Sequence, residues 1–186
     1  MKFVTLPINK KFKTIDMKNI KHLALCFALG LFAVSCSTTK ELSYDIEAKS
    51  NTQTGGTVTF TQEGGKVTMR VHATGLTPGL HAMHLHEIAD CSADDAMSTG
   101  GHWNPTGHDH GRWEEGEFHM GDIGNLNANA EGVATLLFIT DKWCIGCNDE
   151  TRNILNKSVI IHADADDFHT QPTGNAGGRV GCVEIK

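Results

Sequence analysis

The chain has 186 residues and a formal net charge of −6 at pH 7, with 39% hydrophobic and 20% charged residues. This length allows one domain with a sizeable core plus an extension, and the composition is that of a soluble globular protein. The first 36 residues carry six lysines and one acid, so the remainder has 10 basic against 21 acidic residues, a balance that argues against nucleic acid as a partner.

Residues 1–36 are predicted to be a signal region, with Met17 as the true start of translation. Lys18 and Lys21 form a basic head, and residues 23–34 are an apolar run of twelve. That run is too short to span a bilayer comfortably. An export signal therefore explains it better than a permanent membrane anchor.

The signal ends in Ala33-Val34-Ser35-Cys36, which resembles the processing site of a bacterial lipoprotein. The prediction is that Cys36 becomes the lipid-carrying first residue, so that the mature protein contacts a membrane only through this anchor. The alternative is a plain signal peptide with a chance cysteine, because Ala33 stands where leucine is usual.

Residues 37–56 are polar and contain turn residues, and they are predicted to be a tether. Beyond them, short alternating or apolar stretches separated by glycine-rich turns predict β-strands, which favours an antiparallel sandwich or barrel. Residues 148–156 could form one or two helical turns. The predicted strands are 57–61, 67–73, a segment containing His84 and His86, 133–140, 158–163 and 180–185.

Histidines concentrate between residues 81 and 122, which hold seven of the eleven in the chain. His84 and His86 are two residues apart, so on a strand both imidazoles lie on one face and point at one place. Neutral imidazole is the commonest protein metal ligand; imidazole-rich sites suit copper, and histidines with one aspartate suit zinc. The spacing therefore predicts a metal site. The other candidate ligands along the chain are His102, His108, His110, His119, Asp122 and His162.

Four sequence blocks follow one another in the order Gly79-Leu80-His81-Ala82-Met83-His84-Leu85-His86-Glu87, Gly101-His102-Trp103-Asn104-Pro105, Gly121-Asp122-Ile123-Gly124-Asn125 and Gly174-Asn175-Ala176-Gly177-Gly178-Arg179. Each block alone is a weak signal, but together they resemble the signature of the copper-zinc superoxide dismutase family. The similarity covers about residues 57–186. It implies an all-β fold, an eight-stranded antiparallel Greek-key β-barrel of immunoglobulin-like sandwich architecture, of which this family is itself a standard example, with long metal-binding and electrostatic loops.

The resemblance also implies one copper and one zinc ion per subunit. It assigns copper to His84, His86, His102 and His162, and zinc to His102, His110, His119 and Asp122. His102 occurs in both sets because in the family one imidazolate bridges the two metals. His110 lies eight residues after His102, which is the family spacing, and His108 is the alternative zinc ligand.

Further roles are implied by the same resemblance. Arg179 would be the catalytic anion anchor beside copper, and His102 would carry a proton as well as bind metal. Asp166, four residues after His162, would hydrogen-bond one copper and one zinc histidine, although by itself it could equally be a solvated loop acid. Cys91 and Cys182 would form a disulfide within the subunit. His81 is expected to be structural, and His72 and His169 to lie on the surface.

Cys144 and Cys147 lie in the motif Trp-Cys-Ile-Gly-Cys, which is outside the eukaryotic pattern of the family. A local disulfide is the preferred interpretation. A redox centre is one alternative, although no βαβ pattern surrounds the motif, and an accessory metal or copper-delivery site is another.

The implied activity is the disproportionation of superoxide to dioxygen and hydrogen peroxide, by an exported oxidoreductase of the periplasm or cell envelope. The alternatives are a copper or zinc buffer on the same fold and a surface interaction protein with a degenerate site. A binder has no need of Arg179, Asp166 and a bridging His102, so the enzyme is preferred. A homodimer is one option for its assembly. Residues 163–178 contain no lysine, which predicts slower and less salt-sensitive capture of superoxide than in lysine-guided relatives.

Overall fold

The structure, a computed structural model, describes residues 39–186. The predicted signal region, its start at Met17 and the acceptor Cys36 lie outside these residues. Within residues 39–186, no helix has the length and apolar character needed to cross a membrane.

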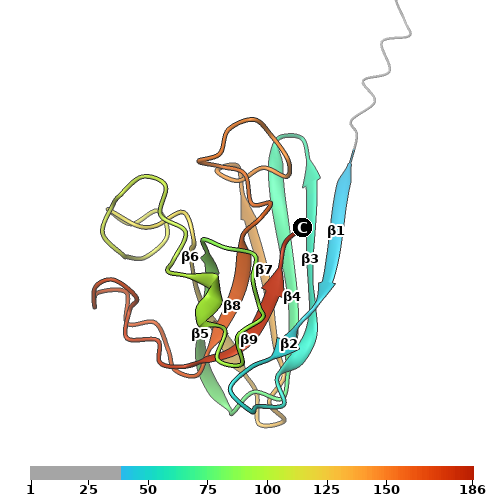
Figure 1. Ribbon diagram of the computed structural model, residues 1–186, viewed down its shortest axis with the longest axis vertical. Helices are drawn as coiled ribbons and strands as arrows, with labels where there is room; N and C mark the ends of the chain where they lie inside the picture. Colours follow the sequence, from blue (N-terminus) through green and yellow to red (C-terminus); the bar gives the residue numbers. More distant parts are fainter. Residues whose placement is uncertain (1–38) are drawn as a thin grey trace, which may run out of the picture. The chain divides into compact units, whose positions relative to one another are not determined.

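Two antiparallel sheets form a β-sandwich (Figure 1). One sheet has the strand order β1 (Lys40–Asp45), β3 (Gly55–Glu63), β4 (Lys66–Thr74) and β7 (Ala134–Thr140). The other has the order β2 (Glu47–Ala48), β9 (Arg179–Glu184), β8 (Ser158–His162), β5 (Gly79–His86) and β6 (Asp122–Ala128). The only helix in residues 39–186 is a 3-10 turn, η1 (Met97–Thr99).

The core lies between the sheets because successive side chains of a strand point to opposite faces. In β4, Val67, Met69 and Val71 are buried, whereas the residues between them are partly or fully exposed. They join Phe60 of β3 and Leu85 of β5 in one hydrophobic cluster. Burial of each such side chain stabilises the fold by about 1.5–3 kcal/mol.

The all-β sandwich is confirmed, but it has nine strands instead of the expected eight, and the two sheets do not close into a barrel. The described part of the predicted tether, residues 39–56, is more than a linker, since it contributes β1, β2 and the start of β3. In β1, Leu42 and Tyr44 alternate with polar residues and pack against the core. This period of two was a readable strand signal.

Two further elements differ from expectation. The polar, glycine-containing sequence of β6 gave no strand signal, because Gly and Asn are depleted in strands. Residues 148–156 form turns and one isolated bridge, between Cys144 and Asn153, and no helix.

Two long connections carry most of the predicted site residues. Residues 87–121 join β5 to β6, and residues 163–178 join β8 to β9; both project on the side of β5 and β6 in Figure 1. Gln171 ties them together, because its side chain accepts a hydrogen bond from the His110 amide at 2.8 Å and donates one to the His110 carbonyl at 2.8 Å. The loops therefore meet over the strands that carry the histidines.

Candidate metal centre

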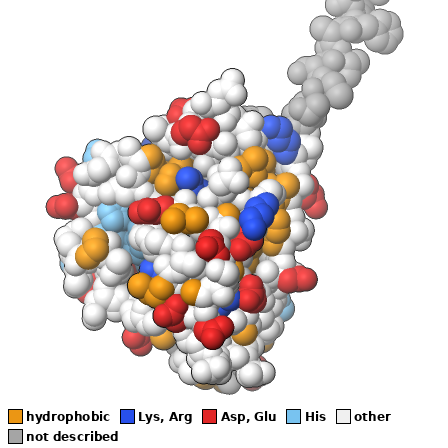
Figure 2. Space-filling model, viewed as in Figure 1, with side chains coloured by type: hydrophobic (Ala, Val, Ile, Leu, Met, Phe, Trp, Pro, Cys, Tyr) orange, Lys and Arg blue, Asp and Glu red, His pale blue; other side chains and the backbone are white. Residues whose placement is uncertain are grey.

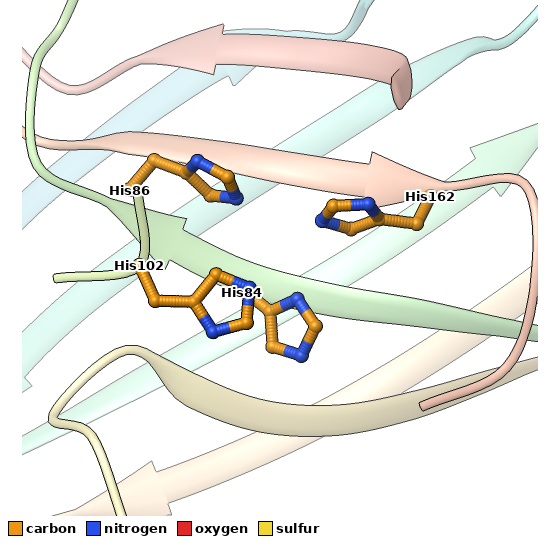
Figure 3. A group of neighbouring side chains, drawn as sticks. All are labelled: His84, His86, His102 and His162. Atoms are coloured by element: carbon orange, nitrogen blue, oxygen red, sulfur yellow. The ribbon is translucent and has the colours of Figure 1, made fainter. Parts of the chain in front are cut away.

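Neighbouring strands and one loop bring four imidazoles together, as Figure 3 shows. His84 and His86 are fully buried on β5, and β8, which pairs with β5, ends at His162. A backbone bridge between His86 and His102 holds the loop against the same strand. In this first set (His84, His86, His102 and His162), one ring nitrogen from each residue lies within 4.8 Å of the others.

A second set consists of His102, His110, His119 and Asp122, whose ligand atoms also lie within 4.8 Å of one another. Asp122 is at its centre: Oδ1 lies 3.0 Å from His102 Nδ1, and Oδ2 accepts hydrogen bonds from the His119 amide at 2.8 Å and the Gly111 amide at 3.1 Å. His102 belongs to both sets, so its ring connects them.

Unpartnered nitrogens show that both sets fit metal ions. Each of the six histidines has one buried ring nitrogen without a hydrogen-bond partner. Orphaned buried polar atoms are rare and costly, so six in one place fit a role as metal ligands. Nδ1 of His110 and Nδ1 of His119 lie 3.0 and 3.3 Å from Asp122 oxygens without forming a hydrogen bond, which suits groups that share a cation. The unpartnered atoms are His84 Nδ1, His86 Nε2, His102 Nε2, His110 Nδ1, His119 Nδ1 and His162 Nε2.

Asp166 connects the two sets by hydrogen bonds to one histidine of each. It is buried, and its carboxylate accepts from His84 Nε2 at 2.8 Å and from His110 Nε2 at 2.9 Å, one histidine of each set. Such partners fix the tautomer and the orientation of a ligand ring. Gly174 permits the contact, since a Cβ there would lie 1.9 Å from Asp166 Oδ1. The loop-acid interpretation is therefore wrong, because a solvated acid would not be enclosed in this way.

Burial lowers the pKa values of several of these imidazoles, which favours the neutral form that binds metal ions. It is the main reason that the pKa values of His86 and His162 are held well below their usual range, with neighbouring imidazoles adding to the effect. Burial likewise lowers the pKa of His102 to about 4, against the opposing effect of Asp122. These rings are thus neutral near pH 7 and offer lone pairs. Burial also lowers the pKa of His110, but Asp122 and Asp166 outweigh it and raise the value to about 9.

The carboxylate of the second set stays ionised. Burial alone would raise the pKa of Asp122, but the surrounding imidazoles of His102, His110 and His119 hold it far below its usual range. A permanent negative charge beside these imidazoles favours a cation at this set.

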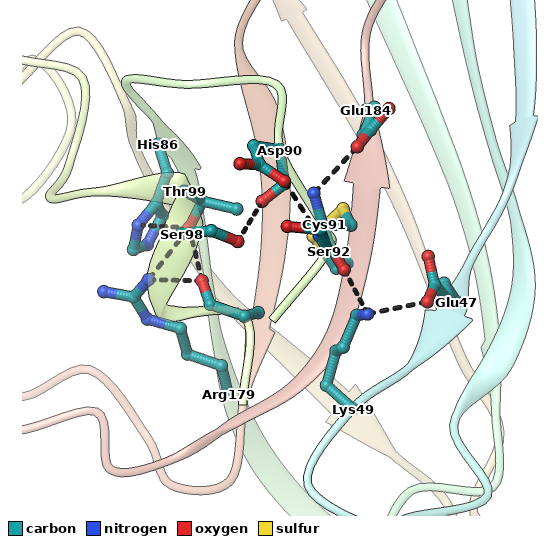
Figure 4. Close-up of a disulfide and its surroundings, with 12 residues drawn as sticks. Glu47, Lys49, His86, Asp90, Cys91, Ser92, Ser98, Thr99, Arg179 and Glu184 are labelled. Carbon is teal, nitrogen blue, oxygen red and sulfur yellow. Dashed lines mark hydrogen bonds and ion pairs between the residues drawn. A yellow bond between two sulfur atoms is a disulfide. The ribbon is translucent and has the colours of Figure 1, made fainter. Parts of the chain in front are cut away.

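Arg179 faces the first set across an open pocket of about 310 Å³, which His86 and His162 also line. Three hydrogen bonds fix its guanidinium: Nη1 donates to Ala96 O at 2.7 Å and to Thr99 Oγ1 at 2.8 Å, and Nη2 donates to Gly100 O at 2.8 Å. Figure 4 shows Arg179 beside Thr99 and His86. A guanidinium remains charged in such a setting. The pocket therefore leads from solvent to the first set past a fixed positive charge.

The structure contains both expected disulfides, Cys91–Cys182 and Cys144–Cys147. Cys182 lies on β9, three residues after Arg179, so the first bond fastens the loop that supplies the acceptors of Arg179 (Figure 4). Lys49 donates to the Cys91 carbonyl and pairs with Glu47 at 2.6 Å. Two disulfides are typical of proteins that fold in an oxidising compartment outside the cytoplasm.

Four further histidines among residues 39–186 lie outside both sets. His108 is exposed, so the structure brings His110 and not His108 into the second set. His81 is buried, with Nδ1 2.8 Å from the His162 carbonyl and Nε2 2.8 Å from the Thr77 carbonyl, which is a structural role. His72 and His169 are exposed.

Sequence reasoning missed two polar residues that support the centre. Asn125 exchanges two hydrogen bonds with the backbone of Asp166, at 2.8 and 3.0 Å. Thr99 is fully buried between Arg179 and His86. Asn125 stood at the end of a recognised block, which was a usable signal, whereas no spacing rule marks Thr99.

Comparison with known proteins agrees with this geometry. A solved structure of a double mutant of a SOD-like protein from Bacillus subtilis is 28% identical in sequence, with a TM-score of 0.68, covering 77% of this chain and 95% of that one. The sequence model of a family described as copper/zinc superoxide dismutase matches residues 54–185. Copper and zinc are the metals of this family, and the two sets could hold them. The chain belongs to the copper/zinc superoxide dismutase family.

Proposed function

We propose that the protein is a superoxide dismutase, which converts two superoxide anions and two protons into one dioxygen and one hydrogen peroxide. The observation that carries the proposal is the position of His102. Nδ1 of its ring contacts the carboxylate of Asp122 in the second set. Its unpartnered Nε2 belongs to the first set, which faces Arg179 across the pocket.

The two sets suit different metals. Copper fits the first set, which is made only of imidazoles and includes two histidines that line the pocket. Zinc would fit the second set, because its three histidines and one buried aspartate supply four protein donors of the kinds that zinc binds. When bound, copper supplies the one-electron redox chemistry, and zinc supplies a fixed charge without redox chemistry. The assignment therefore needs His102 as a ligand on both sides.

The protein's own groups bind the anion and handle the proton. Arg179 offers a fixed cation at the pocket, because three backbone and side-chain acceptors already hold its guanidinium. His102 can hold a proton at Nε2 and pass it to a reduced dioxygen species in the pocket, while Asp122 fixes the ring through Nδ1. Asp166 fixes the orientation of the His84 and His110 rings through their Nε2 atoms.

A dismutase assay of the protein loaded with one copper and one zinc per chain tests the proposal. We expect rapid removal of superoxide in proportion to copper content. A protein that binds both metals tightly and shows no activity would be an exported metal buffer. The fixed Arg179 in the pocket favours the enzyme, because metal storage makes no use of an anion site.

Thr99 offers a narrow test of the anion site. Its hydroxyl accepts from Arg179 at 2.8 Å, donates to the Ala96 carbonyl at 2.9 Å and lies 3.4 Å from His86 Nδ1. Thr99→Val keeps the shape and removes the hydroxyl, so we expect azide affinity, titrated by the copper(II) visible spectrum, to fall about tenfold, the scale of one charge-assisted hydrogen bond. Thr99→Ser keeps the hydroxyl and should bind azide as the wild type does; equal affinity in all three proteins would contradict this role.

The surface charge predicts weak salt dependence. Residues 163–178 contain no lysine, Asp95 lines the pocket, and acidic side chains are spread over the face shown in Figure 2. Arg179 is then the main attraction for an anion, and salt screens little long-range steering. We expect kcat/KM, measured by pulse radiolysis, to change only weakly between about 10 and 200 mM salt, where the Debye length falls from ~30 to below 10 Å. A steep fall with ionic strength would show that other cations guide the substrate.

A further inference from the structure

The motif Trp-Cys-Ile-Gly-Cys at residues 143–147 has no part in the proposed reaction, yet its backbone is firmly held. Within the motif, Cys144 donates to the Arg152 carbonyl at 2.8 Å and accepts from the Ile154 amide at 3.0 Å. The Gly146 amide donates to Asn153 Oδ1 at 2.9 Å. The Cys144–Cys147 disulfide closes the same short ring. The backbone of residues 144–147, directly after Trp143, is therefore fixed in place.

This setting does not suit a redox centre or a third metal site. Reactive Cys-x-x-Cys pairs rely on a helix N-terminus or a nearby cation to stabilise the thiolate. In residues 39–186 the only helix is η1, which is distant in sequence, and Cys144 is buried. The one cation bonded to the motif in these residues, Lys40, donates to the Ile145 carbonyl at 2.7 Å and to neither sulfur. The metal-capable groups among the described residues include neither cysteine. The role of residues 144–147 must therefore be sought in the neighbouring residue that they hold in place.

The side chain of Trp143, which precedes residues 144–147, reaches the second set. It is fully buried, and its indole Nε1 donates to the Met120 carbonyl at 2.9 Å. Met120 lies in the turn from His119 to Asp122, which the Asp122 amide closes by donating to the His119 carbonyl at 3.0 Å. One side chain from another part of the fold thus holds the centre of the turn that carries two members of the set.

Aromatic packing extends this contact to the rest of the loop. Trp113 lies between His110 and His119 in the sequence, and its ring packs edge-on against Trp143 at 5.8 Å and against Phe138 of β7 at 5.0 Å. Phe138 and Trp143 are themselves 5.0 Å apart. The loop that carries the second set therefore rests on Trp143 at two points.

We propose that Trp143, held in place by the Cys144–Cys147 disulfide, is a positioning residue that sets the zinc affinity of the second set. The proposal rests on the proposed function, which assigns zinc to that set. Without the indole N–H, the Met120 carbonyl would be left buried and unpaired, and the turn could relax to reach another donor. His119 and Asp122 would then leave the geometry that a tetrahedral ion requires.

The test compares zinc dissociation constants by chelator competition in the full chain with its disulfides formed. Trp143→Phe keeps an aromatic ring and loses only the N–H donor with part of the ring. We expect it to bind zinc about tenfold more weakly, the lower end of the loss seen when outer partners of ligands are removed. Phe138→Leu is the matched control, since it disturbs the same aromatic group and leaves the Met120 hydrogen bond; we expect its zinc affinity within about twofold of the wild type.

A second readout separates positioning from general stability. Ligand binding raises the melting temperature by an amount set by its dissociation constant. Trp143→Phe should therefore show a smaller zinc-dependent rise in Tm than the wild type. An unchanged rise with an unchanged dissociation constant would overturn the proposal, as would equal losses in Trp143→Phe and Phe138→Leu.

The disulfide is tested by Cys144→Ser with Cys147→Ser, for which we expect several-fold weaker zinc binding. Unchanged zinc binding in this variant would overturn the proposal as stated, because Trp143 would then hold the turn without the disulfide; this criterion applies also if Trp143→Phe does not fold. Failure of the wild type to bind zinc at the second set would refute the proposed function together with this inference. Tight zinc binding by both the wild type and Trp143→Phe would refute the inference only.

Discussion

Replacing His102 by alanine is expected to lower dismutase activity by at least about a hundredfold, the contribution of one positioned proton donor, and to weaken both metals. The ring is a member of both sets, and no other described residue is shared between them. Its removal leaves three donors in each set and takes away the proton carrier at Nε2. Metal binding and proton delivery should therefore fail together.

The measurement is a dismutase assay at full copper loading, together with metal analysis after dialysis. His108→Ala is the matched control, because His108 is an exposed histidine six residues away on the same loop and belongs to neither set. It should retain wild-type activity and metal content. A His102→Ala protein that keeps both metals and most of its activity would show that the two sets work independently.

The ligands could be predicted from the sequence because their signals are local. His84 and His86 show the spacing of one strand face, and the eight residues from His102 to His110 match a known block. The approach of His162 to His84 and His86 in the first set depends on β5 pairing with β8, which no single stretch encodes. The resemblance supplied the grouping of His162 with His84 and His86, and periodicity could not have done so.

Supporting contacts were harder to predict because they join segments far apart in the chain. Trp143 and Met120 are 23 residues apart, and Lys49 and Cys91 are 42 apart. A hydrogen bond from an indole or an ammonium group to a backbone carbonyl produces no recognisable sequence motif, because every residue has the same carbonyl group. Strand β1 was missed for another reason: it is a polar edge strand, in which only Leu42 and Tyr44 show the buried face.

Removing the Cys91–Cys182 disulfide, by Cys91→Ser with Cys182→Ser, is expected to lower the free energy of unfolding by about 4–5 kcal/mol. The bond closes a loop with a sequence separation of 91, and the chain entropy released in the unfolded state grows with loop length. Removing Cys144–Cys147, with a separation of 3, should cost only about 2 kcal/mol by the same argument. Urea unfolding of the metal-free proteins measures both values, and equal losses would contradict the entropic explanation.

The same change should also disturb the anion site, because the disulfide holds together the two segments that form it. Cys182 fixes β9, which begins at Arg179, and Cys91 begins the loop whose Ala96 and Thr99 accept hydrogen bonds from that guanidinium. None of the metal ligands lies on the stretch from Cys91 to Thr99. We therefore expect activity and azide affinity to fall in the disulfide variant while it still takes up copper and zinc. Loss of the metals before loss of anion binding would show instead that the bond supports the ligand loops, and that Arg179 is held well enough by its own hydrogen bonds.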